Sequence, residues 1–285
     1  AACGIVPAVT RALLIDGGQS GLRAALQVDG ATVARETLPG LARAGRSWEP
    51  VRALVRRFDA DVVAAGLSGY DGADLGVPII VASDAVTAHL GALGGEPGAV
   101  IVAGTGAIAL AASADGWARA DGWGPLLGDA GGGYWIARRA LARALRAHDG
   151  RGGSAALRAA AERRFGPLAS IARVVYDARD PVATVAAFAV DVAELAAGGG
   201  ADAAAILTAA GKELARTVTA ALNGAPSCPR RVSWAGGVFG AGPLILDALR
   251  AELEADVVAP LGDGLAGAAR LLERPALFSG LIHGP

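Results

Sequence analysis

Lysine, methionine and cysteine are scarce in this chain of 285 residues. Lys212 is the only lysine, methionine is absent, and Cys3 and Cys228 are the two cysteines. Two cysteines and three scattered histidines are too few for a metal knuckle or a disulfide framework, so we expect a reducing compartment, the cytoplasm. A phosphate-binding P-loop ends in Gly-Lys-Ser/Thr. Because Lys212 lies in a helical pattern without that context, this class of nucleotide-binding protein is excluded.

The chain also lacks a large net charge and a long apolar run. Lys and Arg total 26 and Asp and Glu total 27, which gives a formal net charge of −1. This balance favours a small neutral or dipolar partner over nucleic acid or an anionic membrane. The longest uncharged apolar run, residues 99–112, is shorter than the roughly 20 residues of a spanning helix. We therefore expect no membrane segment, and residues 1–10 do not match a secretion signal.

The first part of the chain predicts a β-meander. Apolar runs at residues 13–15, 22–28 and 31–38 are separated by Asp16-Gly17-Gly18 and by Asp29-Gly30. Asp-Gly between two strand-like runs is a strong hairpin signal, so antiparallel strands follow the first strand. A dinucleotide-binding fold needs a helix at that place and is disfavoured. The later patterns predict a helix over 49–58, strands over 61–67 and 79–83, a helix over 84–93 and a hinge over 94–98.

The same order recurs after the hinge. A strand over 99–103, a turn at 104–106 and strands over 108–113 and 117–121 form a second predicted meander. Alanine-rich patterns predict helices over 134–148, 154–165, 182–197 and 201–222, then a strand over 232–235 and a last helix over 264–272. This repeat predicts two related α/β lobes, which we place at residues 1–95 and 96–285.

Two glycine-rich turns are candidates for binding an anion. In Asp16-Gly-Gly-Gln-Ser-Gly21 the glycines let backbone amides approach an anion, and the Ser20 hydroxyl can donate a hydrogen bond. Taken alone, the turn is equally well explained as an ordinary hairpin. Gly104-Thr105-Gly106 holds the same place in the second half. The pair predicts a phosphate clamp with one turn from each lobe.

Two acidic residues stand where ligand chemistry is expected. Asp84 ends a short strand and begins a helix, where capping the helix is the ordinary role. Strand ends are also where α/β proteins place ligand chemistry. The loop over 122–134 holds six glycines and two aromatic residues, with Asp129 as its only ionisable group. A plain connector rarely has this composition, so a binding role is favoured there.

These segments together resemble a known family. They are Asp16-Gly-Gly-Gln-Ser20, Leu67-Ser-Gly69, Ser83-Asp-Ala85, Ala103-Gly-Thr-Gly106, Gly122-Trp-Gly-Pro-Leu-Leu-Gly-Asp129, Tyr134-Trp-Ile-Ala137 and Ala235-Gly-Gly-Val238. Their order and rough spacing are similar to the N-acetylglucosamine kinases and the wider BadF/BadG/BcrA/BcrD ATPase family, over nearly the whole chain. The resemblance implies a two-lobed actin-like ATPase (ribonuclease H-like) α/β fold. Each lobe would be a mixed sheet opened by a β-meander and flanked by helices, with ATP and sugar meeting in the interlobe cleft.

The resemblance also implies an activity. The implied enzyme would be an ATP- and Mg²⁺-dependent kinase that phosphorylates N-acetylglucosamine or a related hexosamine at O6, and it would form a homodimer. Asp84 matches the general base, and Asp16 is placed to hold Mg²⁺ through water. The implied sugar contacts are Ser68, Gly122, Trp123, Gly124 and Asp129. The implied phosphate contacts are Gly17, Gly18, Ser20, Gly104, Thr105 and Gly106, with Gly236 and Gly237 beside the adenosine.

Three departures from the family pattern affect the predicted site. The family's Gly-Asp-Glu-Gly reads Gly128-Asp-Ala-Gly131, and Gly21 stands where a basic residue usually follows Ser20. The loop over 40–49 has no asparagine, whereas the family loop carries an Asn-His-Trp-like group. The first two changes remove a carboxylate near the sugar and a positive charge near the phosphates. Arg43 and Arg46 of the loop could receive an anionic substituent or could be solvated.

Other functions stay open as alternatives. A hydrolase is suggested by Gly66-Leu-Ser-Gly-Tyr70, but the last glycine of G-x-S-x-G is displaced by one position and no histidine has a partnering context. A non-catalytic sugar or nucleotide sensor could use the same scaffold. So could a non-sugar ATPase such as an acyl-CoA reductase activator, although two separate cysteines do not supply its iron–sulfur cluster.

Overall fold

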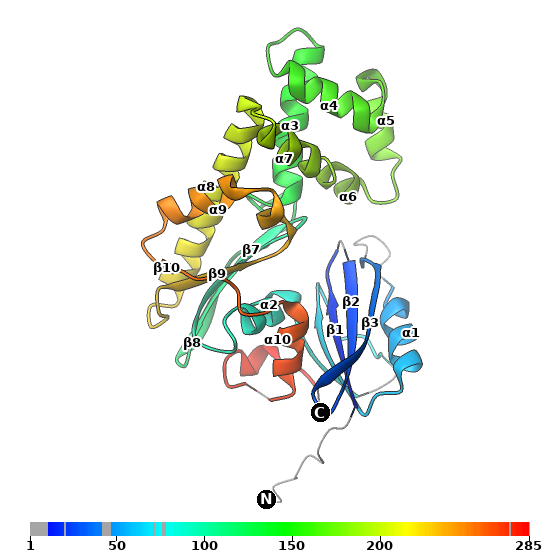
Figure 1. Cartoon of the computed structure of the whole chain (residues 1–285), viewed down its shortest axis with the longest axis vertical. Helices are drawn as coiled ribbons and strands as arrows, with labels where there is room; N and C mark the ends of the chain where they lie inside the picture. The colour runs from blue at the N-terminus through cyan, green and yellow to red at the C-terminus, as the bar shows by residue number, and fades with distance from the viewer. Residues whose placement is uncertain are drawn as a thin grey trace, which may run out of the picture. The chain divides into compact units, whose positions relative to one another are not determined.

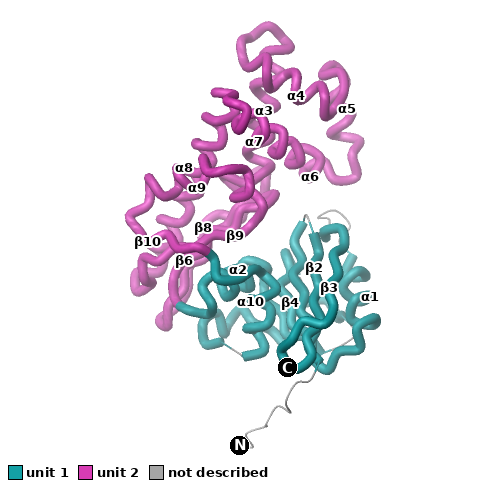
Figure 2. Tube along the Cα trace, in the orientation of Figure 1, with its two compact units in different colours: residues 1–96, 260–285 teal, residues 97–259 magenta. Residues whose placement is uncertain are grey.

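The computed structural model describes residues 11–19, 21–41, 47–70, 72–75, 78–273 and 275–284. The chain forms two compact units (Figure 2). Unit 1 comprises residues 1–96 and 260–285, and unit 2 comprises residues 97–259. The expected second lobe, 96–285, therefore differs from the structure at its end. The reason is that the last helix packs on a helix of unit 1 and not on unit 2.

Unit 1 is built on a mixed five-stranded sheet. Strands β1 (Arg11–Gly17), β2 (Gly21–Val28) and β3 (Ala31–Pro39) form the predicted antiparallel meander. Strands β4 (Val62–Leu67) and β5 (Ile79–Ala82) continue the sheet parallel to β1, in the order β3-β2-β1-β4-β5. At the predicted hairpin turn, Asp29 and Gly30 adopt φ of 49° and 79°, the left-handed region that Asp and Gly tolerate best.

Helices cover both faces of this sheet (Figure 1). Helix α1 (Glu49–Phe58) buries Val51 and Leu54 against Leu13 and Ile15 of β1. Since side chains alternate along a strand, Asp16 points to the other face, where α2 (Asp84–Ala92) and α10 (Gly264–Leu271) pack together. The two helices touch closely, because a β-carbon on Gly267 of α10 would overlap the Thr87 carbonyl of α2.

Unit 2 repeats the sheet topology. Strands β6 (Gly98–Ala103), β7 (Ala107–Ser113) and β8 (Gly116–Asp121) form the second meander. Strands β9 (Arg231–Ala235) and β10 (Asp256–Val257) extend it, in the order β10-β9-β6-β7-β8, with β9 parallel to β6. Two mixed sheets, each opened by a meander, confirm the expected fold class.

The helices of unit 2 depart from the predictions in three places. They are α3 (Gly133–His148), α4 (Ala155–Phe165), α5 (Ile171–Tyr176), α6 (Pro181–Ala186), α7 (Ala189–Ala197), α8 (Ala201–Gly224) and α9 (Pro243–Glu252). The single helix expected over 182–197 is broken into α6 and α7 at Phe188, whose ring is fully buried and lies 5.7 Å from that of Phe165. Helices α5 and α9 were not predicted.

Within the described ranges, no single helix is long and apolar enough to cross a membrane. One pair, Pro181–Ala197 with Ala201–Gly224, reaches that length and composition only jointly and is bent by 117°.

Candidate active site

In unit 1 the predicted site residues gather at one edge of the sheet. Strands β1, β4 and β5 run parallel, with Gly17 opposite Leu67 and Gly66 opposite Ala82, so their carboxyl ends share that edge. The glycine turn follows β1, Ser68 follows β4 and Asp84 follows β5. The Ser68 amide donates to the Gly17 carbonyl at 2.8 Å, which ties the turn to the end of β4. Such edges are where α/β sheets place ligand chemistry.

Asp84 is the first residue of α2 and does not cap it. The cap is Ser83, whose hydroxyl oxygen accepts from the Val86 amide at 3.3 Å. The ordinary capping role expected for Asp84 is therefore wrong. Its own Oδ1 accepts from the Ala85 amide at 3.0 Å, and Ser68 donates a side-chain hydrogen bond to its carboxylate. A β-carbon on Gly18 would lie 3.9 Å from Oδ2, so this carboxylate lies beside the glycine turn.

The environment of Asp84 favours a protonatable carboxyl group. Burial and then the negative charge of Asp16 raise its pKa from 3.8 to about 6, while the hydrogen bonds from Ala85 and Ser68 oppose the rise. A carboxylate with a pKa near 6 is mostly ionised at neutral pH yet is a better proton acceptor than an ordinary aspartate. This combination is typical of a general base.

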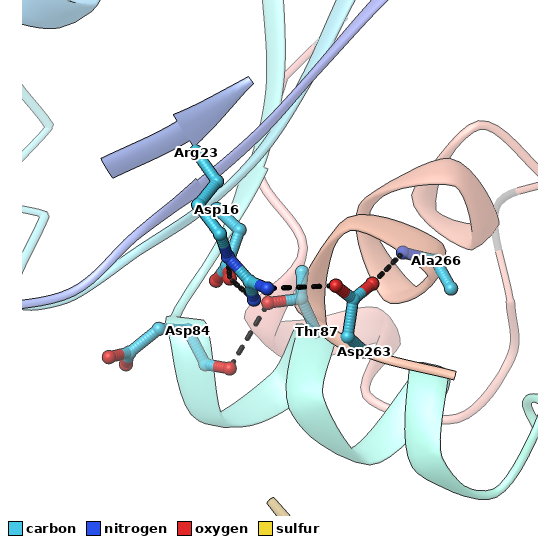
Figure 3. A network of polar contacts seen from close by, with 6 residues as sticks. All are labelled: Asp16, Arg23, Asp84, Thr87, Asp263 and Ala266. Atoms are coloured by element: carbon cyan, nitrogen blue, oxygen red, sulfur yellow. Dashed lines mark hydrogen bonds and ion pairs between the residues drawn. The ribbon is translucent and has the colours of Figure 1, made fainter. Parts of the chain in front are cut away.

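Asp16 is paired with a residue that sequence reasoning missed (Figure 3). Arg23 lies directly opposite it in the β1–β2 ladder and binds its Oδ2 through Nε, at 3.2 Å, and through a terminal nitrogen. The other terminal nitrogen reaches Oδ2 of Asp263 at 2.9 Å. Burial raises the pKa of Asp16 even though Arg23 lowers it.

In unit 2 the second glycine turn is joined to the start of α3. The amides of Gly133 and Tyr134 donate to the carbonyls of Gly104 and Thr105, at 2.8 and 2.9 Å. A β-carbon on Gly106 would overlap the Asp129 carboxylate, so only glycine lets the acidic residue pack against the turn. The structure thus brings the predicted turn and the predicted loop together.

Asp129 organises the loop that carries it. Its side chain is 4% exposed, and its Oδ1 accepts from the Gly124 amide at 3.0 Å. Asp121, which sequence reasoning missed, accepts from the amides of Asp129 and Ala130 at 2.7 and 2.9 Å. These bonds hold the loop in a fixed shape. The contact of Asp129 with a sugar stays a prediction.

The other predicted residues of unit 2 directly follow the ends of strands β8 and β9. Trp123 is 66% exposed, and the Arg119 guanidinium lies 4.6 Å from its ring centre. Gly122 and Gly124, on either side of it, have φ of 74° and 93°. Gly236 follows β9, and a β-carbon on it would overlap the Ala103 carbonyl at the end of β6. Gly237 begins the adjacent 3-10 turn.

Some predicted residues cannot be compared with the structure. Ser20, Arg43 and Arg46 lie outside the described residues. The pairing of Asp16 with Arg23 could have been predicted, because the hairpin places the two residues opposite one another. The contact of Arg23 with Asp263 could not, because the two residues lie 240 positions apart along the chain.

The chain is similar to known proteins over most of its length. The model of the BadF/BadG/BcrA/BcrD ATPase family matches residues 24–269. The chain belongs to this family. An N-acetylmuramic acid/N-acetylglucosamine kinase of Clostridium acetobutylicum is 33% identical over an alignment of 125 residues that covers 40% of this chain. The match spans 39% of that relative's length.

Two solved structures of sugar kinases share the fold. A candidate N-acetylglucosamine kinase from Chromobacterium violaceum superposes with a TM-score of 0.73 at 27% identity, covering 93% of this chain and 100% of its own. A ROK family glucokinase from Streptomyces griseus, in complex with glucose and AMPPNP, gives a TM-score of 0.59 at 19% identity, covering 92% and 98%. At that lower identity the likeness shows the fold alone.

Proposed function

We propose that this member of the family is an ATP- and Mg²⁺-dependent amino-sugar kinase. Its substrate is N-acetylglucosamine or a related hexosamine, phosphorylated at O6. The observation that carries the proposal is the partly buried Asp84 carboxylate, whose pKa is raised to about 6, beside the glycine turn of β1. The Clostridium and Chromobacterium relatives are named as amino-sugar kinases, which supports a sugar as the acceptor.

In the proposed reaction Asp84 accepts the proton of the attacking O6 hydroxyl. Oxygen O6 forms a bond to the γ-phosphorus of ATP as the bond to the β-γ bridging oxygen breaks, and ADP leaves. Phosphoryl transfer asks the protein chiefly for alignment and charge neutralisation, so no covalent intermediate is required. Amides of the turns over 17–18 and 104–106 would bind phosphate oxygens, with Gly236 and Gly237 beside the adenosine.

Asp16 is the residue proposed to hold the magnesium ion. Mg²⁺ in proteins is usually bound through one or two carboxylates, several waters and the substrate's phosphates. Asp16 fits this chemistry, because it is a carboxylate, with 17% of its side chain exposed, close enough to Asp84 to raise the pKa of that residue. When bound, the ion would neutralise phosphate charge. Within the described part of the chain no group of three or more His, Cys, Asp or Glu could hold a metal by itself.

The sugar is proposed to bind at the loop over 122–134. Trp123 offers an exposed ring as an apolar wall, and Gly122 and Gly124, which flank it, are further proposed contacts. Ser68 and Asp129 complete the proposed contacts, with Asp129 orienting the sugar through charge-assisted hydrogen bonds. We further propose that the protein is a homodimer in the cytoplasm. Sedimentation velocity of the purified protein tests the dimer.

A coupled ADP-release assay tests the activity. The panel is glucosamine, N-acetylglucosamine, glucose, mannose and N-acetylmuramic acid, each with Mg·ATP. Sugar-dependent ADP release, with phosphate located at O6 by nuclear magnetic resonance, is the expected result. Binding of a sugar without ADP release would identify a sensor instead. ADP release that no sugar changes would identify an ATPase of another kind.

A further inference from the structure

The Asp16–Arg23 pair is a fixed feature of the β1–β2 hairpin. The two residues face one another in register, and Arg23 places Nε and one terminal nitrogen on the same carboxylate oxygen, Oδ2. The second oxygen, Oδ1, is not used by Arg23. A fork of two nitrogens on one oxygen restricts rotation of the carboxyl group more than a single contact does.

Arg23 is in turn held by the start of the last helix. Its remaining terminal nitrogen binds Oδ2 of Asp263 at 2.9 Å, and Oδ1 of Asp263 accepts from the Ala266 amide at 3.2 Å as the cap of α10 (Figure 3). The cap therefore places a carboxylate at a defined point on α10. Arg23 bridges that point and Asp16.

Helix α10 also confines Asp16 directly. A β-carbon on Gly264, the first residue of α10, would lie 2.5 Å from Oδ1 and 2.6 Å from Cγ of Asp16. The backbone of the helix start thus packs on the carboxyl group. Arg23 binds Oδ2 of Asp16, and the start of α10 packs on the whole carboxyl group, because the same β-carbon would also lie 2.7 Å from Oδ2. Only 17% of the Asp16 side chain is exposed.

Stability does not explain this arrangement. The side chains of Arg23 and Asp263 are 44% and 49% exposed, and ion pairs with such exposure contribute little to folding. The contacts converge instead on Asp16, the carboxylate proposed to hold the metal ion, which points to a functional role.

We propose that Arg23 and Asp263 are positioning residues that fix the Asp16 carboxylate for the metal ion of the nucleotide. Arg23 orients Asp16, and Asp263 anchors Arg23 to the start of α10. The inference rests on the proposed function only in taking a magnesium nucleotide as the ligand. It assigns a role to the last helix, which contributes none of the family motifs found in the sequence.

The test measures how much Mg²⁺ improves ADP binding. Isothermal calorimetry gives the dissociation constant of ADP in EDTA and in saturating Mg²⁺, and their ratio is the metal gain. Arg23→Lys keeps the positive charge but loses the fork, so we expect the metal gain to fall about five- to tenfold while metal-free ADP binding is unchanged. Arg57→Lys, which alters the Arg57–Glu36 ion pair between α1 and β3, is the matched control.

Asp263→Asn separates anchoring from capping. Asparagine caps a helix as well as aspartate does, so α10 keeps its cap while the ion pair to Arg23 is lost. We expect a reduced metal gain with unchanged hydrogen-exchange protection of the Ala266 amide, whereas Asp263→Ala loses both. The double variant Arg23→Lys/Asp263→Asn should lose less than the product of the single losses, because both changes break one chain of contacts.

Two results would overturn the inference. One is an Arg23→Lys variant whose metal gain stays within twofold of wild type, or whose metal-free ADP binding falls by the same factor, since Arg23 would then contact phosphate directly. The other is an Asp263→Asn variant with the wild-type metal gain. Failure of the proposed function is seen separately, as a wild type that binds Mg·ADP but releases no ADP with any sugar.

Discussion

Replacing Asp84 with asparagine removes one proton acceptor and little else. Asparagine has the same shape, and its carbonyl oxygen can still accept from the Ala85 amide that lies 3.0 Å from Oδ1. At pH 7.5, well above the pKa of about 6, about 97% of wild-type molecules carry the carboxylate. We expect Asp84→Asn to bind the sugar normally and to lower kcat by roughly 10²–10⁴-fold, the range for losing a general base, or about 3–5 kcal/mol.

The same change should stabilise the folded protein. The pKa of Asp84 is 3.8 in the unfolded chain and about 6 in the folded chain. Protonated Asp84 therefore favours folding fully below pH 3.8, and this contribution to the free energy of unfolding is lost as the pH rises through about 6. At pH 8 the charged Asp84 therefore costs folding on the order of 2–3 kcal/mol, as an upper estimate from that rise. Asp84→Asn should unfold at higher urea than wild type at pH 8, and the difference should shrink toward pH 4.

Two measurements decide the outcome. Coupled ADP release gives kcat and the sugar KM, and urea unfolding at pH 4 and pH 8 gives the stability difference. Asp180→Asn, which exchanges one helix cap for another at the start of α6, is the matched control and should change neither. An Asp84→Asn variant that keeps more than a tenth of the wild-type kcat would place the base elsewhere. Equal or lower stability at pH 8 would refute the electrostatic reasoning.

Three other expectations concern the pH profile, the start of α10 and the loop over 40–49. kcat/KM should fall about tenfold per pH unit below pH 6, as Asp84 takes up its proton, and this limb should vanish in Asp84→Asn; an unchanged limb contradicts the assignment. Gly264→Ala should displace Asp16 and lower kcat about tenfold, whereas Gly280→Ala, where a β-carbon meets open space, should be silent; equal effects would show that the close approach is unimportant. The loop over 40–49 lacks the asparagine side chain of the family loop, and each lost hydrogen bond costs about 0.5–1.5 kcal/mol, so this enzyme should prefer another sugar to N-acetylglucosamine or bind that sugar weakly. A micromolar KM for that sugar, unchanged in Arg46→Ala, would refute this.

Much of the fold followed from local signals in the sequence. Asp29-Gly30 correctly predicted the hairpin between β2 and β3, and the helix predicted over 49–58 is α1, with the same bounds. Helix α9 was missed, and Phe188 divided a run that reads as one helix. At Phe188 burial against a distant ring overrode the local preference.

The candidate site divides in the same way. Residues that follow strand ends, such as Ser68 and Asp84, could be placed together from the sequence, because parallel strands bring their carboxyl ends to one edge. The capping role of Asp84 could not be judged, since Ser83 and Asp84 are both good caps and only the backbone of the structure decides between them.

Contacts between distant segments set the limit of sequence reasoning at Asp16. Gly264 reads from the sequence as an ordinary glycine at the start of a helix, and nothing nearby marks it as special. Its importance comes from the packing of α10 on α2 and on β1, which brings the start of the helix against Asp16. A β-carbon on Gly264 would lie 2.5 Å from Oδ1 of Asp16. The return of residues 260–285 to unit 1 is thus a functional feature of the proposed site as well as a feature of the fold, because it delivers Asp263 and Gly264 to Asp16.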